Sequence, residues 1–358
     1  MSNASILDQH LAEKGILLAD GATGTNLFAM GLQTGDSPEL WNVDHPERIE
    51  KLYRDFIDAG SDLILTNTFG GTHFRLGLHG AEKRVHELNH QAAVIARNEV
   101  AKSGRSVIVA GSMGPTGEIL EPNGEVSVAA ATEAFAEQAV ALKEGGADIL
   151  WLETLSSKEE IVAAVTGAAV TELPIVYTVS IDTNGRTMMG VTAQDVINIK
   201  NDLTHPVAAV GTNCGVGAAE VVVAIVNLKT AADNVDTNPI LVAKANCGIP
   251  EFVDGKIVYN GTPEIMHEYV LLAANAGAKI IGGCCGTTPE HIRTMRKALD
   301  NRLPGPSPEL ETIVNTLGEV SRGATAQFHG EMGVEAGSAS GRGARVSRRR
   351  SKSRPTNR

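Results

Sequence analysis

Short runs of aliphatic and β-branched residues alternate with longer amphipathic stretches over residues 16–301. Most of the short runs are continuously apolar, which is typical of parallel strands that are buried on both faces. The pattern predicts eight strands, at residues 16–20, 62–69, 106–114, 148–154, 174–181, 207–214, 239–247 and 279–285.

The stretches between these strands carry helix start and stop signals. Pro46, Pro263 and Pro289 are each followed by Glu, a pattern favoured at the first helical positions. Gly60 and Gly277 stand where two of the helices are expected to end. Eight strands with crossover helices predict an α/β fold, a (βα)8 TIM barrel over residues 16–302. The alternative is a doubly wound open sheet, but no G-x-G-x-x-G follows the first strand.

The predicted barrel is flanked by three further segments. Residues 1–15 form an N-terminal lead-in, and residues 303–322 form a C-terminal helical extension whose amphipathic part either closes the barrel base or joins a dimer. Residues 323–358 are rich in Gly, Ala, Ser and Arg, and the last 18 residues hold eight Lys and Arg and no acid. This composition predicts a disordered basic tail.

Charge and composition narrow the possible partners and location. The chain has a net charge of −11, and its basic residues concentrate in the tail, so the acidic barrel is not expected to bind nucleic acid. It lacks an apolar run long enough to span a membrane and an N-terminal signal peptide, and its four Cys are too few for a disulfide framework. The sequence therefore predicts a cytoplasmic protein without membrane contact.

Polar side chains stand at the end of every predicted strand. In a barrel of this kind the carboxyl ends of the strands meet at one mouth, where active sites lie. The mouth is therefore expected to gather Asp20, Asn67, Ser112, Glu153, Ser180, Cys214, Asn246, Cys284 and Cys285.

Three of these residues suggest a metal centre. Cys214 ends the sixth strand, and Cys284 and Cys285 end the eighth among glycines that let the backbone turn. Three thiolates without a fourth obligatory ligand describe a catalytic zinc site with one open position, because soft sulfur ligands select zinc over magnesium or calcium. Cys247, at the end of the seventh strand, is interpreted as a spectator.

Six short motifs stand at the predicted strand ends: DGATGT at 20–25, TNTFG at 66–70, GSMGPTG at 111–117, ET at 153–154, NC at 213–214 and GGCCGT at 282–287. Together they resemble the motifs of the homocysteine S-methyltransferase family over about four-fifths of the chain. Within that family they most resemble the bacterial betaine–homocysteine methyltransferases. The paired Asn-Cys and double-Gly, double-Cys motifs are the most specific.

The resemblance implies roles for individual residues. Cys214, Cys284 and Cys285 would bind Zn²⁺, with the Asn246 carbonyl as a further ligand in a resting state. The substrate-binding set would include Asn67. Asp20, the Gly21 backbone and Glu153 would hold the amino group of homocysteine, and backbone donors around Ser112 would receive its carboxylate. The expected partners are homocysteine and a methyl donor, and the chain is a possible homo-oligomer.

The expected reaction moves a methyl group from glycine betaine to homocysteine, giving dimethylglycine and methionine. Phe69 matches an aromatic residue of the animal betaine enzyme, whereas Gly70 replaces the aromatic that follows it there. Trp41, Phe28 and Phe74 lie near the same loops and are further candidates for cation–π contact with the donor. The chain is expected to lack an attached cobalamin or folate module.

Other functions remain open at this stage. The donor could instead be S-methylmethionine, dimethylsulfoniopropionate or a separate corrinoid protein. A non-catalytic sensor of homocysteine and zinc is a second class of function. A carbon–carbon lyase is a third, and Lys244 is its only candidate Schiff-base residue.

Overall fold

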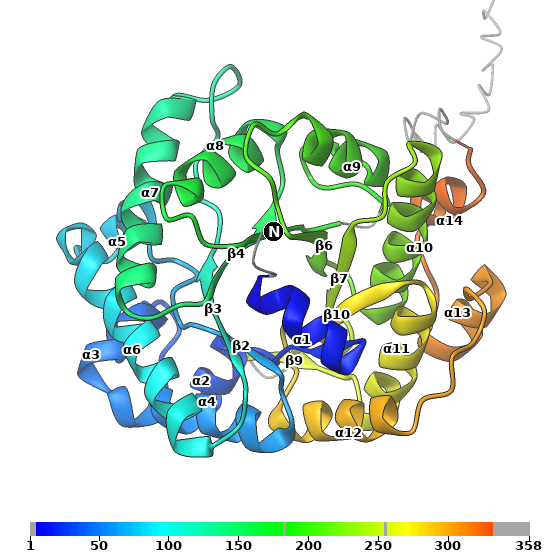
Figure 1. Cartoon of the computed structure of the whole chain (residues 1–358), viewed down its shortest axis with the longest axis horizontal. Coiled ribbons are helices and arrows are strands. Elements are labelled where there is room, and N and C mark those ends of the chain that lie inside the picture. Colours follow the sequence, from blue (N-terminus) through cyan, green and yellow to red (C-terminus); the bar gives the residue numbers. More distant parts are fainter. Residues whose placement is uncertain (1–4, 182–183, 254–255, 332–358) are drawn as a thin grey trace, which may run out of the picture.

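The structure, a computed structural model, describes residues 5–181, 184–253 and 256–331. Eight parallel strands form a ring surrounded by helices, which confirms the predicted (βα)8 barrel (Figure 1). In chain order the barrel strands are β1 (Leu17–Leu18), β2 (Leu63–Leu65), β3 (Ile108–Met113), β4 (Ile149–Leu155), β5 (Ile175–Val179), β6 (Ala209–Cys214), β7 (Ile240–Ala245) and β10 (Ala278–Gly283).

Each strand pairs in parallel with its neighbours around the ring, in the order β1, β10, β7, β6, β5, β4, β3, β2. A parallel bridge between Ala19 and Leu63 joins β1 to β2 and completes the circle. All eight strands lie within the predicted runs except for Leu155, one residue after the fourth run, and Ala278, one residue before the eighth run. The carboxyl ends of all the strands therefore open at one rim.

Eight helices cover the outside of the ring, and the predicted Pro46, Pro263 and Pro289 begin three of them. Their bounds are α4 (Pro46–Ala59), α6 (Val85–Ser103), α7 (Val128–Glu144), α8 (Lys158–Ala169), α9 (Ala193–Asp202), α10 (Ala218–Asn234), α11 (Pro263–Asn275) and α12 (Pro289–Asp300). Gly60 closes α4 in the left-handed conformation, at φ 109°, as its position predicted.

Shorter elements lie in the segments that connect the barrel strands. Between β1 and β3 lie α2 (Gly24–Ala29), α3 (Trp41–Asp44), α5 (His73–Gly77) and the 3-10 turns η1 (Pro38–Leu40) and η2 (Glu82–Arg84). After β7, an antiparallel hairpin of β8 (Pro250–Val253) and β9 (Lys256–Tyr259) follows, which the hydrophobic pattern did not predict.

The N-terminal lead-in forms a helix, α1 (Ile6–Lys14), that seals the inside of the barrel (Figure 1). Leu7 of α1 is fully buried and joins a separate inner cluster with apolar residues from the strands, Trp151 among them. Asp62, at the start of β2, accepts hydrogen bonds from Lys14 Nζ at 2.7 Å and Leu18 N at 2.9 Å, and forms an ion pair with Arg296 of α12 at 3.1 Å. These contacts fasten α1 to the strands and to the outer ring.

The C-terminal extension differs from its prediction in extent. Helix α13 (Leu310–Leu317) packs against α10 and α11 within the same chain. The predicted disordered tail began at residue 323, but residues 322–328 form helix α14 (Arg322–Phe328), so that boundary was wrong. Helix α14 is held because Ser321 N donates to Glu220 Oε1 at 2.6 Å and Ala324 is buried. The basic residues of the last 18 positions lie outside the described residues.

No helix in the described part of the chain is both long enough and apolar enough to cross a membrane.

The inner cluster predicts that α1 contributes directly to stability. Replacing Leu7 by Ala should lower the free energy of unfolding by about 2–5 kcal/mol, because the change leaves a cavity between α1 and the strands. Urea unfolding followed by circular dichroism measures this effect. The exposed Glu13 of the same helix provides the control, and its change to Ala should have an effect within about 0.5 kcal/mol. Equal effects of the two substitutions would contradict the sealing role of α1.

Candidate metal and substrate site

Three cysteine sulfurs converge at the mouth of the barrel. The Sγ atoms of Cys214, Cys284 and Cys285 all lie within 4.8 Å of one another, a spacing that allows them to hold one metal ion. Cys214 ends β6, and β10 stops at Gly283, so the two adjacent cysteines follow the strand instead of alternating across it.

The backbone around the two adjacent cysteines is fixed by the neighbouring strand β7. Cys284 N donates to Ala245 O at 2.6 Å, and Cys247 N donates to Cys285 O at 2.8 Å. Asn246 adds a third link, because its Oδ1 accepts from Cys285 N at 3.0 Å. The position of both sulfurs therefore depends on pairing across two strands as well as on the local sequence.

The three thiols hold their protons strongly when no cation is present. The hydrogen bond with Cys284 is the main cause that raises the pKa of Cys214 to about 12. The hydrogen bond with Cys214 likewise raises the pKa of Cys285 to about 11, and burial adds to both shifts. Thiolates so close together repel one another, so a divalent cation that replaces the protons removes the main electrostatic obstacle. The donor set fits a soft divalent metal such as zinc.

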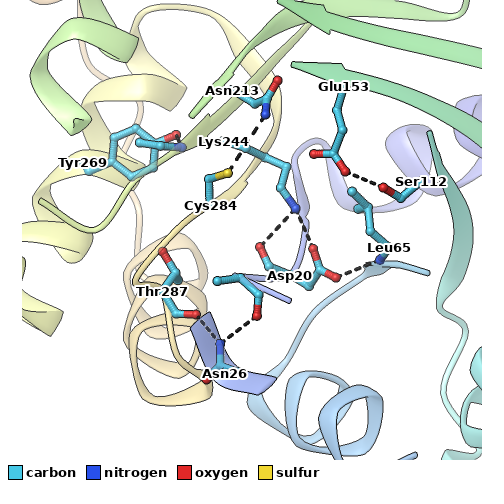
Figure 2. A network of polar contacts seen from close by, with 12 residues as sticks. Asp20, Asn26, Leu65, Ser112, Glu153, Asn213, Lys244, Tyr269, Cys284 and Thr287 are labelled. Atoms are coloured by element: carbon cyan, nitrogen blue, oxygen red, sulfur yellow. Dashed lines mark hydrogen bonds and ion pairs between the residues drawn. The ribbon is translucent and has the colours of Figure 1, made fainter. Parts of the chain in front are cut away.

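Asn213 connects the cysteine cluster to the neighbouring strand ends. Its Oδ1 accepts from Thr154 N at 2.9 Å and from Thr178 Oγ1 at 2.6 Å. Its Nδ2 donates to Thr154 Oγ1 at 2.8 Å and faces Cys284 Sγ at 4.0 Å (Figure 2). Thr154 and Cys214 both have positive φ, near 60°, a conformation that non-glycine residues rarely adopt. The Asn213 amide thus holds the strained Thr154, and the strained Cys214 follows Asn213 in the chain.

A charged group lies beside the cysteines on the floor of the mouth (Figure 2). Lys244 Nζ forms an ion pair with Asp20 Oδ1 at 2.6 Å, and both side chains are 3% exposed. Asp20 Oδ2 also accepts from Leu65 N at 2.7 Å. Ser112 Oγ donates to Glu153 Oε1 at 2.5 Å. Four strands and the end of β1 therefore supply this polar floor.

Burial governs the protonation of these groups. It works to lower the pKa of Lys244, but the carboxylates of Asp20 and Glu153 outweigh it, so the pKa is raised and the ammonium stays charged. Burial also raises the pKa of the Glu153 carboxyl, and the charge of Lys244 offsets only part of this shift.

Other predicted site residues have different surroundings. The Nδ2 of Asn67 donates to Pro38 O at 2.7 Å and Asn42 Oδ1 at 2.9 Å, so its amide group holds the loop after β1. Ser112 N donates to Thr66 Oγ1 at 3.0 Å. A Cβ at Gly21 would lie 2.6 Å from Thr287 O, so only glycine fits where β1 meets the end of β10.

The aromatic residues considered for donor binding differ in exposure and surroundings. Trp41 is buried, and its ring is already covered by Arg48 at 4.5 Å. Phe69 is 36% exposed and lies against Gly114 at the ends of β2 and β3, and Phe28 is 48% exposed on α2.

Two contacts of the site were not foreseen from the sequence. Tyr259 of β9 is hydrogen-bonded to Cys285, and its ring packs over Gly286. The ion pair of Lys244 with Asp20 joins residues from opposite ends of the barrel sequence. A lysine within a continuously apolar strand was the available signal for the second contact, and nothing in the sequence pattern indicated the first.

The chain was compared with known proteins. A family model described as homocysteine S-methyltransferase matches residues 17–299. Methionine synthases of Mycobacterium tuberculosis and Mycobacterium leprae are each 30% identical, over 84% and 87% of this chain. The matched regions make up 26% of each of those proteins, so this chain spans about a quarter of their length.

The chain is also similar to solved structures of a homocysteine methyltransferase. The metallated form of the homocysteine methyltransferase MmuM from Escherichia coli is 26% identical and superposes with a TM-score of 0.68, covering 81% of this chain and 99% of that one. Its oxidized form gives a TM-score of 0.67. The family model covers well over half of the chain, and the resemblance noted in the six motifs is thereby confirmed. The chain belongs to the homocysteine S-methyltransferase family.

Proposed function

We propose that this chain is a zinc-dependent methyltransferase that converts L-homocysteine to L-methionine, with Cys214, Cys284 and Cys285 as the zinc ligands. The convergence of the three sulfurs at the barrel mouth is the observation that carries this proposal. Zinc bound there would supply Lewis acidity that keeps the substrate thiol deprotonated and fixes its sulfur in place. The need for reduced thiols fits the cytoplasmic location expected from the sequence.

The protein's own residues orient the amino acid beside this centre. Glu153 has one carboxylate oxygen bonded to Ser112, and its other oxygen, which has no hydrogen bond among the described residues, would accept one from the substrate ammonium. Both carboxylate oxygens of Asp20 already have protein partners, so Asp20 acts mainly through its charge. Fixing the ammonium also fixes the direction of the side-chain sulfur, and such alignment is a large part of catalysis in a methyl transfer.

The methyl donor that we propose is glycine betaine. With zinc, three thiolates would carry a net charge of −1, so this side of the mouth would attract a small cation. The exposed ring of Phe69 offers a face for the trimethylammonium group. In the transfer, the homocysteine thiolate attacks a methyl carbon, the C–N bond breaks, and its electron pair remains on the nitrogen of dimethylglycine.

A second candidate donor is a separate protein that carries the methyl group, such as a corrinoid protein. The curated relatives named methionine synthase favour this alternative, because each is about four times as long as the region that matches this chain.

The proposed zinc ligands can be separated from the other cysteine. Changing Cys284 to Ala should abolish stoichiometric zinc binding and reduce methyl transfer at least 100-fold, on the order expected for loss of a metal ligand. Cys247 is buried outside the cluster, so Cys247→Ala should still bind one zinc ion per chain. Zinc is counted by plasma mass spectrometry after gel filtration. Full zinc content in Cys284→Ala would refute the assignment.

Substitution of Glu153 should affect stability and substrate binding in opposite directions. Because burial raises its pKa, the ionised form costs stability at neutral pH, and Glu153→Gln should raise the free energy of unfolding. This gain should be absent below the ordinary glutamate pKa of about 4.3, where both states are protonated, and should grow as the pH rises. The same variant should bind homocysteine roughly 10- to 100-fold more weakly, as for loss of a charged hydrogen bond.

Glu160 of α8 gives a matched control for this prediction. It is also buried, its pKa is also raised by burial, and it is bonded to Thr116 instead of facing the floor of the mouth. Glu160→Gln should gain stability in the same pH range with unchanged homocysteine affinity. Calorimetric titration and urea unfolding at several pH values measure both quantities.

The donor is tested by turnover of zinc-loaded, reduced protein with L-homocysteine and glycine betaine as the only methyl source. Methionine and dimethylglycine should form in equal amounts, as detected by mass spectrometry. If methionine forms only with S-methylmethionine or dimethylsulfoniopropionate, the donor is a sulfonium compound and the assignment of betaine is wrong. Homocysteine binding without turnover of any small donor would favour the methyl-carrying protein.

A further inference from the structure

Lys244 occupies an unusual place for a charged side chain. It lies on β7 two residues beyond Val242, which belongs to the apolar inner cluster, so it faces the barrel interior one layer nearer the mouth. In the same way, Ser112 lies two residues beyond Ala110 on β3, and Glu153 lies two residues beyond Trp151 on β4. The three side chains therefore form one polar layer directly above the apolar interior.

The described contacts of the ammonium group leave it with capacity for another acceptor. Lys244 Nζ has three N–H donors, and within the described residues its hydrogen bonds go to Asp20 alone, to Oδ1 at 2.6 Å and to the carbonyl oxygen at 3.5 Å. Glu153 points toward the same ammonium from the other side (Figure 2). The Lys244 Nζ also lies 5.8 Å from the centre of the Trp151 ring, which forms the apolar floor beneath it.

A purely structural role does not account well for this ion pair. Removing two charges from water is costly, and apolar residues of similar size commonly stabilise a protein as well or better. The pair lies in the layer that borders the mouth, beside the sulfur cluster, rather than within the apolar cluster. Charge placed there can act on a ligand that enters from the mouth.

We propose that Lys244 binds the α-carboxylate of the amino acid substrate while Glu153 binds its α-ammonium. The inference rests on the proposed function, because it assumes that the thiol of the same molecule reaches the cysteine cluster. An amino acid carries its two opposite charges on adjacent atoms of one carbon, and Lys244 and Glu153 offer the opposite charges side by side (Figure 2). The backbone N–H of Ser112, the earlier candidate for the carboxylate, is already bonded to Thr66.

This assignment makes Lys244 a determinant of substrate class. Thiols that have both an ammonium and a carboxylate would be selected over simple aminothiols of the same length. The selection arises because the buried Lys244 ammonium interacts strongly with a carboxylate on the ligand. A ligand that lacks the carboxylate leaves one N–H donor of Lys244 unpaired.

The test compares two thiols that differ only in the carboxylate, L-homocysteine and 3-aminopropane-1-thiol. Titration calorimetry on the zinc-loaded protein measures binding and does not depend on turnover or on the methyl donor. The wild-type protein should bind homocysteine roughly 10- to 100-fold more tightly than the aminothiol, the range of a charge-assisted hydrogen bond. In Lys244→Met this preference should fall to about twofold or less.

Lys14 provides the control for loss of a lysine–aspartate pair. Its Nζ lies 2.7 Å from Asp62 Oδ1 at the other end of the barrel, a geometry close to that of Lys244 with Asp20. Lys14→Met should lose stability and keep the full preference for homocysteine. Lys244→Met could fail to fold because it leaves the buried Asp20 carboxylate unpaired. In that case the double variant Asp20→Asn with Lys244→Met is compared with Asp20→Asn alone. Neither of these two proteins has an uncompensated buried carboxylate at position 20.

The possible results separate the two proposals. A full preference for homocysteine in the Lys244 variant overturns the role of Lys244 and leaves the proposed function standing. A wild-type protein that binds neither thiol overturns the proposed function, and the role of Lys244 with it. Loss of the preference in the Lys14 variant as well would show that it depends on general stability, and would also overturn the assignment.

Discussion

Closure of the strand ring is the constraint on which the rest of the molecule depends. The Ala19–Leu63 bridge joins the first strand to the second, and the contacts of Asp62 secure that seam to α1 and α12. Because the ring is closed, residues from distant parts of the chain end at one rim. Asp20 and Lys244 are 224 positions apart in sequence and yet form a hydrogen bond of 2.6 Å. An open sheet would separate the cysteines of β6 and β10 from the carboxylates of β1 and β4.

The mouth combines two kinds of chemistry that a homocysteine molecule would span. Soft sulfur ligands come from the ends of β6 and β10, and hard ionic groups come from β1, β4 and β7. The sulfur side is suited to a metal and a thiol, and the ionic side is suited to an amino acid backbone. Under the proposed function, neither side alone would specify homocysteine, and the separation of the two sides would select the length of the amino acid side chain that spans them.

The sequence was sufficient for the barrel and for the cysteine cluster because both depend on position along strands. Continuous apolar runs mark parallel strands, and the last residue of each run reaches the mouth whatever its partners are. Hydrogen-bond partners were beyond such reasoning. The hydrogen bond of Asn67 to Pro38 could not be predicted from its place at a strand end, and Tyr259 reaches Cys285 through a hairpin that has no periodic signal. Helix α14 was missed because its stability comes from Glu220 and from packing on α10, not from its own composition.

Asn213 contacts both the cysteine cluster and the strand end that carries Glu153. Its carboxamide holds Thr154, the residue next to Glu153, and also faces the sulfur of Cys284. Under the proposed function, binding of the metal and binding of the amino acid would therefore both affect the position of the Asn213 side chain. Thermodynamic reciprocity then requires that whatever factor the metal applies to the affinity for the amino acid, the amino acid applies to the affinity for the metal. Under the proposed function, the protein would therefore retain its metal more or less firmly according to whether the amino acid is bound.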